Sequence, residues 1–208
     1  MCNSVKELMN QQQNQSIQRG PLTIGDKLPK FSKKAVVSKA TGDEIITMDN
    51  KTLSGKGQWT VLFWWPKDFT FVCPTEIMEF DKRNAEFAAQ NATVVGASTD
   101  SEYVHMGWRQ SHPGLAKLSI ALIADTSKSL AEAMGILDKE EKVAYRATYI
   151  IDPDGIIQWL SIYPMNVGRN VDEVLRILHA LQTEELTACG WRAGEETLTS
   201  KLKQDNVA

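Results

Sequence analysis

Cysteine is scarce in this chain. Its 208 residues contain three cysteines, Cys2, Cys73 and Cys189, and no two of them form a C-x-x-C pair. None lies at zinc-binding spacing from another cysteine or from a histidine. These absences exclude the disulfide framework of small secreted proteins and give no support to a structural zinc site. Reactive thiol chemistry is the better explanation for the cysteines that are present.

Long apolar segments and an excess of basic charge are also missing. The longest apolar runs, such as Val61–Trp65, are far shorter than the roughly 20 residues that span a bilayer. The first twenty residues lack the apolar core of a secretory signal. The chain has 23 lysines and arginines against 26 acidic residues, so it has no basic excess with which to follow a phosphate backbone. We therefore expect a cytoplasmic protein that binds neither membranes nor nucleic acid.

The rest of the composition is that of an ordinary globular protein, with 42% hydrophobic and 24% charged residues. Residues 1–22 are polar and without apolar periodicity, which predicts a mobile N-terminal tail. Residues 23–183 predict a single domain. From residue 184 the periodic apolar pattern fades, so residues 184–208 predict a C-terminal arm, a kind of segment that often belongs to a neighbouring subunit.

Strands and helices alternate along the predicted domain. Short runs rich in apolar and β-branched residues predict strands at 60–64, 93–98 and 119–125. Apolar residues at helical spacing predict helices around 77–88, 101–110 and 129–134. Ser101 is a candidate to cap the second of these helices. This alternation favours parallel strand pairs joined by right-handed crossovers.

The chain continues with a predicted hairpin and a closing helix. The runs ATYIID and IIQWLS flank the turn sequence Asp152–Gly155, and apolar residues recur at helical spacing from Val171 to Leu181. The hairpin adds an antiparallel edge to the sheet. We therefore predict an α/β fold with a central mixed β-sheet and helices on both faces, an element order that matches the thioredoxin-like fold.

The segment most informative about chemistry is PKDFTFVCPTE, between the first strand and its helix. Cys73 falls at the predicted helix start, where unpaired N–H groups and the helix dipole favour a thiolate. The hydroxyl of Thr70 can lie beside the sulfur as a donor, and Pro66, which has no N–H, can keep water out. On the residues alone, an inert buried cysteine, a loop hydroxyl and a turn-fixing proline stay open.

The same segment resembles the active-site signature of the peroxiredoxins, P-x-x-x-T-x-x-C, with Pro66, Thr70 and Cys73 at its fixed positions. The stretches WPKDFTFVCPTEIMEF, VVGASTDSEYVHMGW, ATYIIDPDG and VGRNVDEVLRILHALQ resemble the branch called alkyl hydroperoxide reductase C, or typical two-cysteine peroxiredoxins. The resemblance extends from about Pro21 to Leu198. It implies a thiol-dependent peroxidase for hydrogen peroxide and organic hydroperoxides that serves in antioxidant defence.

The resemblance also implies roles for individual residues. Cys73 is the peroxidatic cysteine, which attacks the O–O bond and becomes a sulfenic acid. Arg146 hydrogen-bonds the thiolate and the peroxide, although its position alone favours a surface ion pair. Cys189 is the resolving cysteine, which forms an intersubunit disulfide, although on the residues alone an unpaired surface thiol stays open. Glu76 either holds an arginine or is a first-turn glutamate favoured by the helix dipole. Cys2 matches no family position.

The family architecture implies a homodimer that assembles into a ring, a decamer or a dodecamer. The disulfide would be reduced by a thioredoxin, a flavoprotein reductase or a carboxymuconolactone-type partner, and the sequence does not distinguish them. We expect no bound cofactor or metal, because nucleotide-binding motifs and paired metal-ligand spacings are missing. A peroxide sensor or redox-regulated chaperone on the same scaffold is the alternative. A thioredoxin-type disulfide oxidoreductase is disfavoured, because Cys73 does not begin a C-x-x-C motif.

Overall fold

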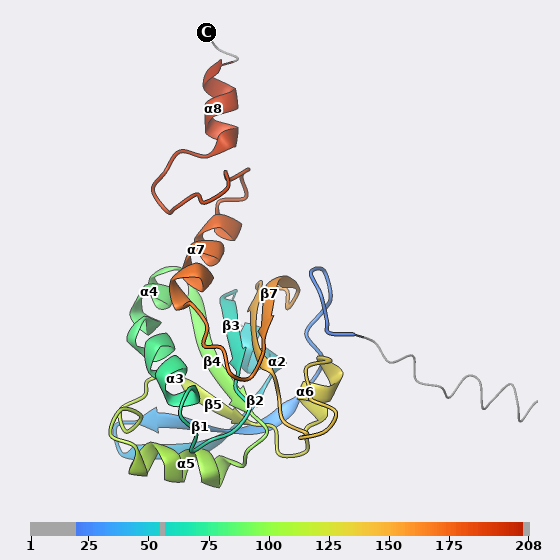
Figure 1. Ribbon diagram of the computed structural model, residues 1–208. Helices are drawn as coiled ribbons and strands as arrows, with labels where there is room; N and C mark the ends of the chain where they lie inside the picture. Colours follow the sequence, from blue (N-terminus) through green and yellow to red (C-terminus); the bar gives the residue numbers. More distant parts are fainter. Residues whose placement is uncertain (1–19, 55–56, 206–208) are drawn as a thin grey trace, which may run out of the picture.

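A mixed β-sheet forms the centre of the fold (Figure 1). In the computed structural model, which describes residues 20–54 and 57–205, the sheet has seven strands in the order β2-β1-β5-β4-β3-β6-β7. They are β1 (Ser32–Lys39), β2 (Gly42–Asp49), β3 (Trp59–Trp64), β4 (Ala92–Ser98), β5 (Ala121–Ala124), β6 (Arg146–Ile151) and β7 (Ile157–Tyr163). The central strands β3, β4 and β5 pair in parallel, and all other pairs are antiparallel.

Helices cover both faces of this sheet. They are α2 (Asn50–Ser54), α3 (Cys73–Lys82), α4 (Asn84–Ala89), α5 (Glu102–Ser111), α6 (Ser129–Ala133) and α7 (Val171–Gln182). A further helix, α8 (Leu198–Asp205), lies beyond α7 and away from the sheet. Side chains of β3 alternate between two cores, as a strand requires. Val61 and Phe63 belong to the core that contains residues of α3, α4, α5 and α7. Leu62 and Trp64 belong to the core that contains residues of α2 and α6. The α/β architecture predicted from the sequence is confirmed.

Local signals explain several boundaries. The hydroxyl of Ser101 accepts a hydrogen bond from the backbone N–H of Val104, so it caps α5 as predicted. Between β6 and β7, the carboxylate of Asp152 accepts the N–H groups of Asp154 and Ile156 at 2.9 Å each. Gly155 has a φ of +80°, a left-handed conformation that suits glycine. The predicted hairpin is therefore confirmed.

Three features were not predicted from the sequence. The first is the hairpin of β1 and β2, in which only a few side chains, such as Ala35 and Val36, are buried. The second is the short helix α2, and the third is helix α8 within the C-terminal arm. The helix predicted around 77–88 is also divided into α3 and α4 at Arg83.

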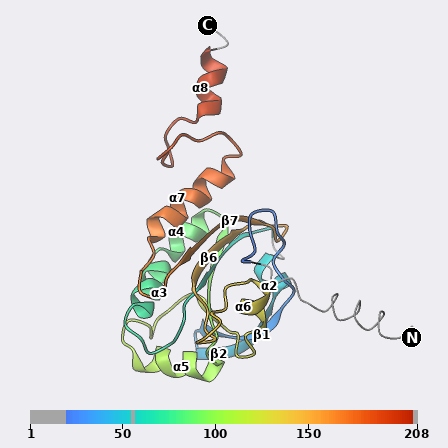
Figure 2. The same ribbon diagram turned by 45° about the vertical axis from the view of Figure 1, so that its right-hand side comes forward.

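Beyond α7, the C-terminal arm and its helix α8 stand clear of the rest of the fold (Figure 2). Residues 1–19 of the predicted N-terminal tail lie outside the described residues, and Leu22 already donates its N–H to the carbonyl of Met134. The arm extends past α7, away from the sheet. It is tied to α7 by a hydrogen bond from Arg176 to the carbonyl of Trp191, whose side chain is buried. Among the helices of the described residues, none is long and apolar enough to cross a membrane.

Candidate active site

The loop from the end of β3 to the start of α3 brings the predicted site residues together. Pro66 is buried at its beginning, Thr70 is half-buried, and Cys73 is the first residue of α3. Phe69 has a φ of +55°, a strained conformation for a bulky residue of the kind that functional loops retain. Pro74 occupies the second position of α3, where its missing N–H leaves no helical hydrogen bond unmade.

The sulfur of Cys73 is buried beside two polar side chains. The residue is 0% exposed, and its Sγ lies 2.9 Å from Thr70 Oγ1 and 3.3 Å from Arg146 Nη1. Thr70 Oγ1 also lies 3.0 Å from the carbonyl oxygen of Lys67. A hydroxyl has one hydrogen, so Thr70 can donate to a thiolate, or donate to the carbonyl and accept the hydrogen of a thiol. The same side chain thus suits both protonation states of the sulfur.

Arg146 reaches the sulfur from the first residue of β6. Its side chain is only 3% exposed, so the surface ion pair considered from the sequence does not describe it. Its Nε donates to the carbonyl of Met165 at 2.7 Å, and its Nη1 donates to Glu76 Oε2 at 2.6 Å. Both contacts fix the guanidinium while Nη1 faces the sulfur. A cation held in place in this way stabilises negative charge on sulfur or on an oxygen bound there.

Glu76 and Arg169 complete the charge arrangement. The Nε and Nη2 atoms of Arg169 donate to the two carboxylate oxygens of Glu76 at 2.8 and 3.0 Å. The guanidinium also lies over the rings of Phe63 and Phe80, at 5.5 and 5.7 Å from their centroids. Two arginines therefore share one buried carboxylate, which leaves a net positive charge beside Cys73.

Sequence reasoning missed Arg169 and left the role of Glu76 open. Glu76 does hold an arginine, and in fact it holds two. A signal for Arg169 exists in hindsight. It directly precedes Asn170, the N-cap of α7, where the helix dipole disfavours a cation, so an arginine there needs another partner.

A second buried group supports the loop from the side of α5. The carboxylate of Asp68 lies 2.7 Å from the indole Nε1 of Trp65 and 2.7 Å from Nδ1 of His105. Nε2 of His105 lies 3.2 Å from the carbonyl oxygen of Ile123, and because a carbonyl only accepts, this nitrogen carries a hydrogen. Burial raises the pKa of Asp68, an effect that the hydrogen bond to His105 opposes. The group ties the active-site loop to α5 and β5.

Cys189 is not brought near this site. It is exposed on the arm between α7 and α8, and both Cys73 and Cys189 are free thiols. Cys2 lies outside the described residues. Within residues 20–54 and 57–205, no group of three or more His, Cys, Asp or Glu side chains could hold a metal ion.

The arrangement as a whole suits attack by sulfur on a small oxygen electrophile. The site offers one nucleophile, one hydroxyl and one fixed guanidinium. Donors aimed at the place where negative charge develops lower the barrier most. Breaking an O–O bond develops such charge on the departing oxygen.

Comparisons with known proteins agree with this chemistry. The family model AhpC/TSA matches residues 24–160. The alkyl hydroperoxide reductase C of Mycolicibacterium smegmatis is 44% identical over 187 residues, which cover 86% of this chain and 94% of the relative. The protein of the same name from Mycobacterium tuberculosis is 45% identical over 185 residues, or 85% of this chain and 93% of the relative.

Solved structures lead to the same family. The AhpC of Mycobacterium tuberculosis matches with a TM-score of 0.74 and 42% identity, over 83% of this chain and 99% of that one. The reduced two-cysteine peroxiredoxin of Plasmodium vivax matches with a TM-score of 0.78 and 30% identity, over 85% of this chain and 93% of that one. These matches confirm the predictions of a thioredoxin-like fold and of a thiol-dependent peroxidase. The chain belongs to the AhpC/TSA family of peroxiredoxins.

Proposed function

We propose that this chain reduces hydrogen peroxide and small organic hydroperoxides in a two-cysteine cycle that serves antioxidant defence. The thiolate of Cys73 attacks one peroxide oxygen, so that an S–O bond forms and the O–O bond breaks. The departing oxygen takes a proton and leaves as water or an alcohol, and the sulfur becomes a sulfenic acid. Thr70 and Arg146 stabilise the charge on the oxygens during this step, and Pro66 helps to keep water out.

The observation that carries the proposal is the surroundings of the Cys73 sulfur. It is fully buried at a helix start, 2.9 Å from a hydroxyl and 3.3 Å from a fixed guanidinium. A cysteine that served only packing would have no use for a buried cation held by two further hydrogen bonds.

Cys189 of the partner subunit resolves the sulfenic acid in this proposal. Its thiol attacks the Cys73 sulfur, a disulfide forms, and water leaves. The exposure of Cys189 and the course of the arm away from its own domain favour a partner across a subunit contact. We also propose the division into an N-terminal tail (1–22), a peroxidase domain (23–183) and an arm (184–208) that carries the resolving cysteine.

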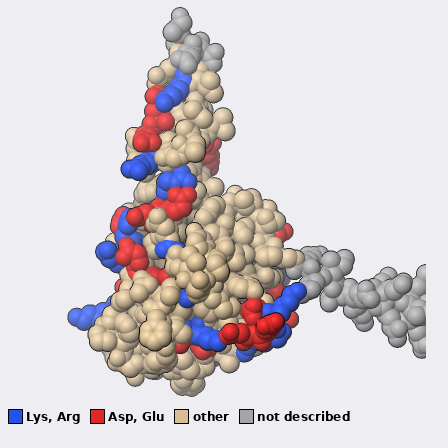
Figure 3. All heavy atoms as spheres, viewed as in Figure 1, with Lys and Arg blue, Asp and Glu red and all other residues tan. Residues whose placement is uncertain are grey.

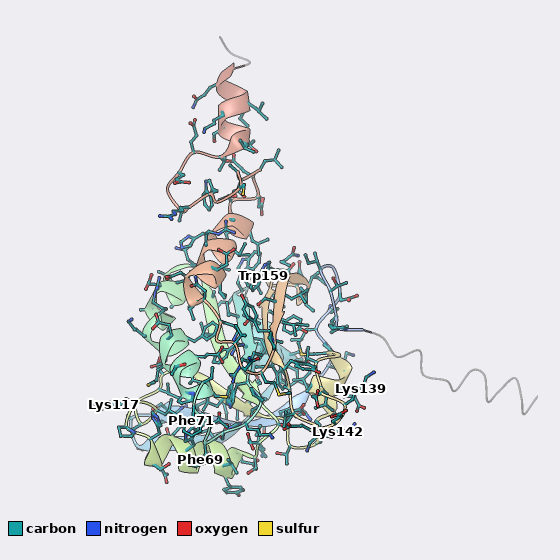
Figure 4. The ribbon with its side chains drawn as sticks, viewed as in Figure 1. Phe69, Phe71, Lys117, Lys139, Lys142 and Trp159 are labelled. Atoms are coloured by element: carbon teal, nitrogen blue, oxygen red, sulfur yellow. The ribbon has the colours of Figure 1, made fainter. Side chains whose placement is uncertain are left out.

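Two surfaces support assembly into a homodimer and then a ring. Strand β7 is the last strand of the sheet in the described part of the chain, so its outer edge can pair with a second copy. Phe69 and Phe71 lie on the active-site loop beside α5, and Phe71 is 94% exposed (Figure 4). On the face drawn in Figure 3, the area over α5 carries few charged side chains. An exposed apolar patch of this kind marks an interaction site. Ring size, decamer or dodecamer, is left to measurement.

Turnover tests the proposal. The wild-type protein should consume many equivalents of hydrogen peroxide when one of three reductants is present: a thioredoxin system, a flavoprotein reductase or a carboxymuconolactone-type partner. Cys73→Ser should abolish consumption with all of them. A protein that consumes one equivalent and stops with every reductant would instead be a peroxide sensor or a redox-regulated chaperone.

A further inference from the structure

A disulfide between Cys73 and Cys189 requires a change in helix α3. Two bonded cysteines have Cα atoms about 4.4–6.8 Å apart, and the attacking thiol must reach the sulfur. The Cys73 sulfur is fully buried, so a thiol on an exposed arm reaches it only after the first turn of α3 opens. Whatever holds α3 in place therefore governs how often Cys73 is released.

The carboxylate of Asp81 ties the far end of α3 to the segment after α5. Oδ1 of Asp81 accepts three hydrogen bonds from the segment after α5: from the N–H of Ser119 at 2.6 Å, from its hydroxyl at 2.7 Å and from the N–H of Ile120 at 3.2 Å. Asn84, just past the end of α3, donates to the same hydroxyl at 2.9 Å. Met78 also lies against Gly114, where an added Cβ would be 2.2 Å from its sulfur.

The segment to which Asp81 binds is itself fixed. Leu115 and Leu118 are buried in the core. From the other side, the buried guanidinium of Arg109 donates to the carbonyl of Leu118 at 2.8 Å and to that of Ile120 at 3.3 Å. Arg109 thus holds the carbonyls of this segment, and Asp81 holds its N–H groups. A helix tied to such a segment cannot move its last turn without breaking hydrogen bonds to a charged group.

We propose that Asp81 is a positioning residue that sets the rate at which Cys73 leaves its buried position, and with it the fate of the sulfenic acid. This inference rests on the proposed two-cysteine cycle. Two reactions compete for the sulfenic acid. In the first, the Cys189 thiol displaces water and a disulfide forms. In the second, another peroxide oxidises the sulfenic acid to a sulfinic acid and leaves as water. Only the first needs α3 to open, so a weaker hold at Asp81 favours the disulfide.

The variants follow from the hydrogen bonds. Asp81→Ala removes the acceptor. Asp81→Asn keeps a neutral acceptor oxygen at the same place, so it should stabilise the closed helix more than Asp81→Ala does and less than the wild type. Glu79→Ala is the matched control, because it removes a carboxylate from the same helix that pairs with Lys82 of α3 itself. Ser119→Ala removes only the hydroxyl donor and serves as the milder variant if Asp81→Ala does not fold.

Hydrogen exchange of the reduced protein, read over residues 73–82, measures how often α3 opens when no peroxide is present. Loss of hydrogen bonds to a charged group should speed exchange by about fivefold or more in Asp81→Ala, and less in Asp81→Asn and Ser119→Ala. After one equivalent of peroxide, disulfide formation should speed up by a similar factor, and the sulfinic acid found by mass spectrometry at higher peroxide should fall. The rate of the first reaction with peroxide should change by less than about twofold, since α3 stays mostly closed.

The inference is overturned if Asp81→Ala, or Ser119→Ala in its place, exchanges and forms the disulfide at the rate of Glu79→Ala. A lower melting temperature with unchanged disulfide rate and sulfinic acid yield also overturns it, because Asp81 is then merely structural. Failure of the two-cysteine cycle is recognised separately, since the wild-type protein then forms no disulfide with Cys189 while the exchange comparison still reports on Asp81.

Discussion

Nη1 of Arg146, at the start of β6, lies 3.3 Å from Sγ of Cys73, at the start of α3. The same nitrogen lies 2.6 Å from Glu76 Oε2, so the cation is shared between a carboxylate and the sulfur. Because Arg169 also binds Glu76, the carboxylate does not cancel the positive charge at the sulfur. The four side chains form one electrostatic unit.

Arg146→Ala should slow the reaction of the reduced protein with hydrogen peroxide by about 10²–10³-fold, the usual cost of removing one donor aimed at developing negative charge. Stopped-flow tryptophan fluorescence measures this rate. Arg146→Lys keeps the charge but not the fork of donors, so it should recover only part of the loss. An alanine variant that folds and reacts at the wild-type rate would show that Arg146 has no part in the chemistry.

Arg169→Ala should lower the free energy of unfolding more than Arg146→Ala does. Its guanidinium makes two hydrogen bonds to Glu76 and further bonds to the carbonyl of Ala147 and the hydroxyl of Thr148. Removal of one partner from a buried ion pair costs about 3–5 kcal/mol. Urea denaturation of the two variants makes the comparison, and equal losses of unfolding free energy would contradict it.

Thr70→Val replaces the hydroxyl that lies 2.9 Å from the sulfur with a methyl group of similar size. The peroxide reaction should slow by about tenfold or more, the loss of a hydrogen bond to a charged group. Thr70→Ser keeps the hydroxyl and should stay within a few-fold of wild type. If the valine variant reacts as fast as the serine variant, the hydroxyl of Thr70 has no part in the chemistry.

The pair of Asp68 and His105 gives a dependence on pH. Burial raises the pKa of Asp68 above its ordinary value of 3.8, so the folded state holds this proton more tightly than the unfolded state. The contribution to stability is therefore fully present below the unfolded pKa and is lost as pH rises through the raised one. Relative to Asp68→Asn, the wild-type protein should lose unfolding free energy from about pH 4 upward. Chemical denaturation at a series of pH values measures the free energy of unfolding of both proteins. A wild-type value that rises with pH relative to the value of Asp68→Asn would contradict this expectation.

Much of the fold could be predicted because its core elements obey simple periodicities. The strands β3, β4 and β6 are buried apolar runs, and α7 places Val171, Val174 and Leu178 on one face. The hairpin of β1 and β2 was not predicted because it is half exposed and rich in lysine, serine and aspartate. Helix α8 was not predicted because its sequence, LTSKLKQD, contains few apolar residues.

The candidate site could be predicted where residues lie close in sequence, and only in part beyond that. One short segment contains Pro66, Thr70 and Cys73, so their spacing in the sequence is enough to predict that they lie close together. Arg146 was found through resemblance, since its position 73 residues from Cys73 gives no local signal. The contact between Glu76 and Arg169 joins residues 93 apart, and only the sheet and α7 bring them together.

One measurement tests the central claim, that Cys73 attacks the peroxide and that Cys189 of the partner subunit resolves it. The fully reduced protein receives one equivalent of hydrogen peroxide and is run on a gel without reductant. A covalent dimer should form in the wild type and in Cys2→Ser, and in neither Cys73→Ser nor Cys189→Ser. Peptide mass spectrometry should find the Cys73–Cys189 disulfide in the dimer band. A dimer that persists in either of the last two variants, or a disulfide that joins other cysteines, would contradict the account.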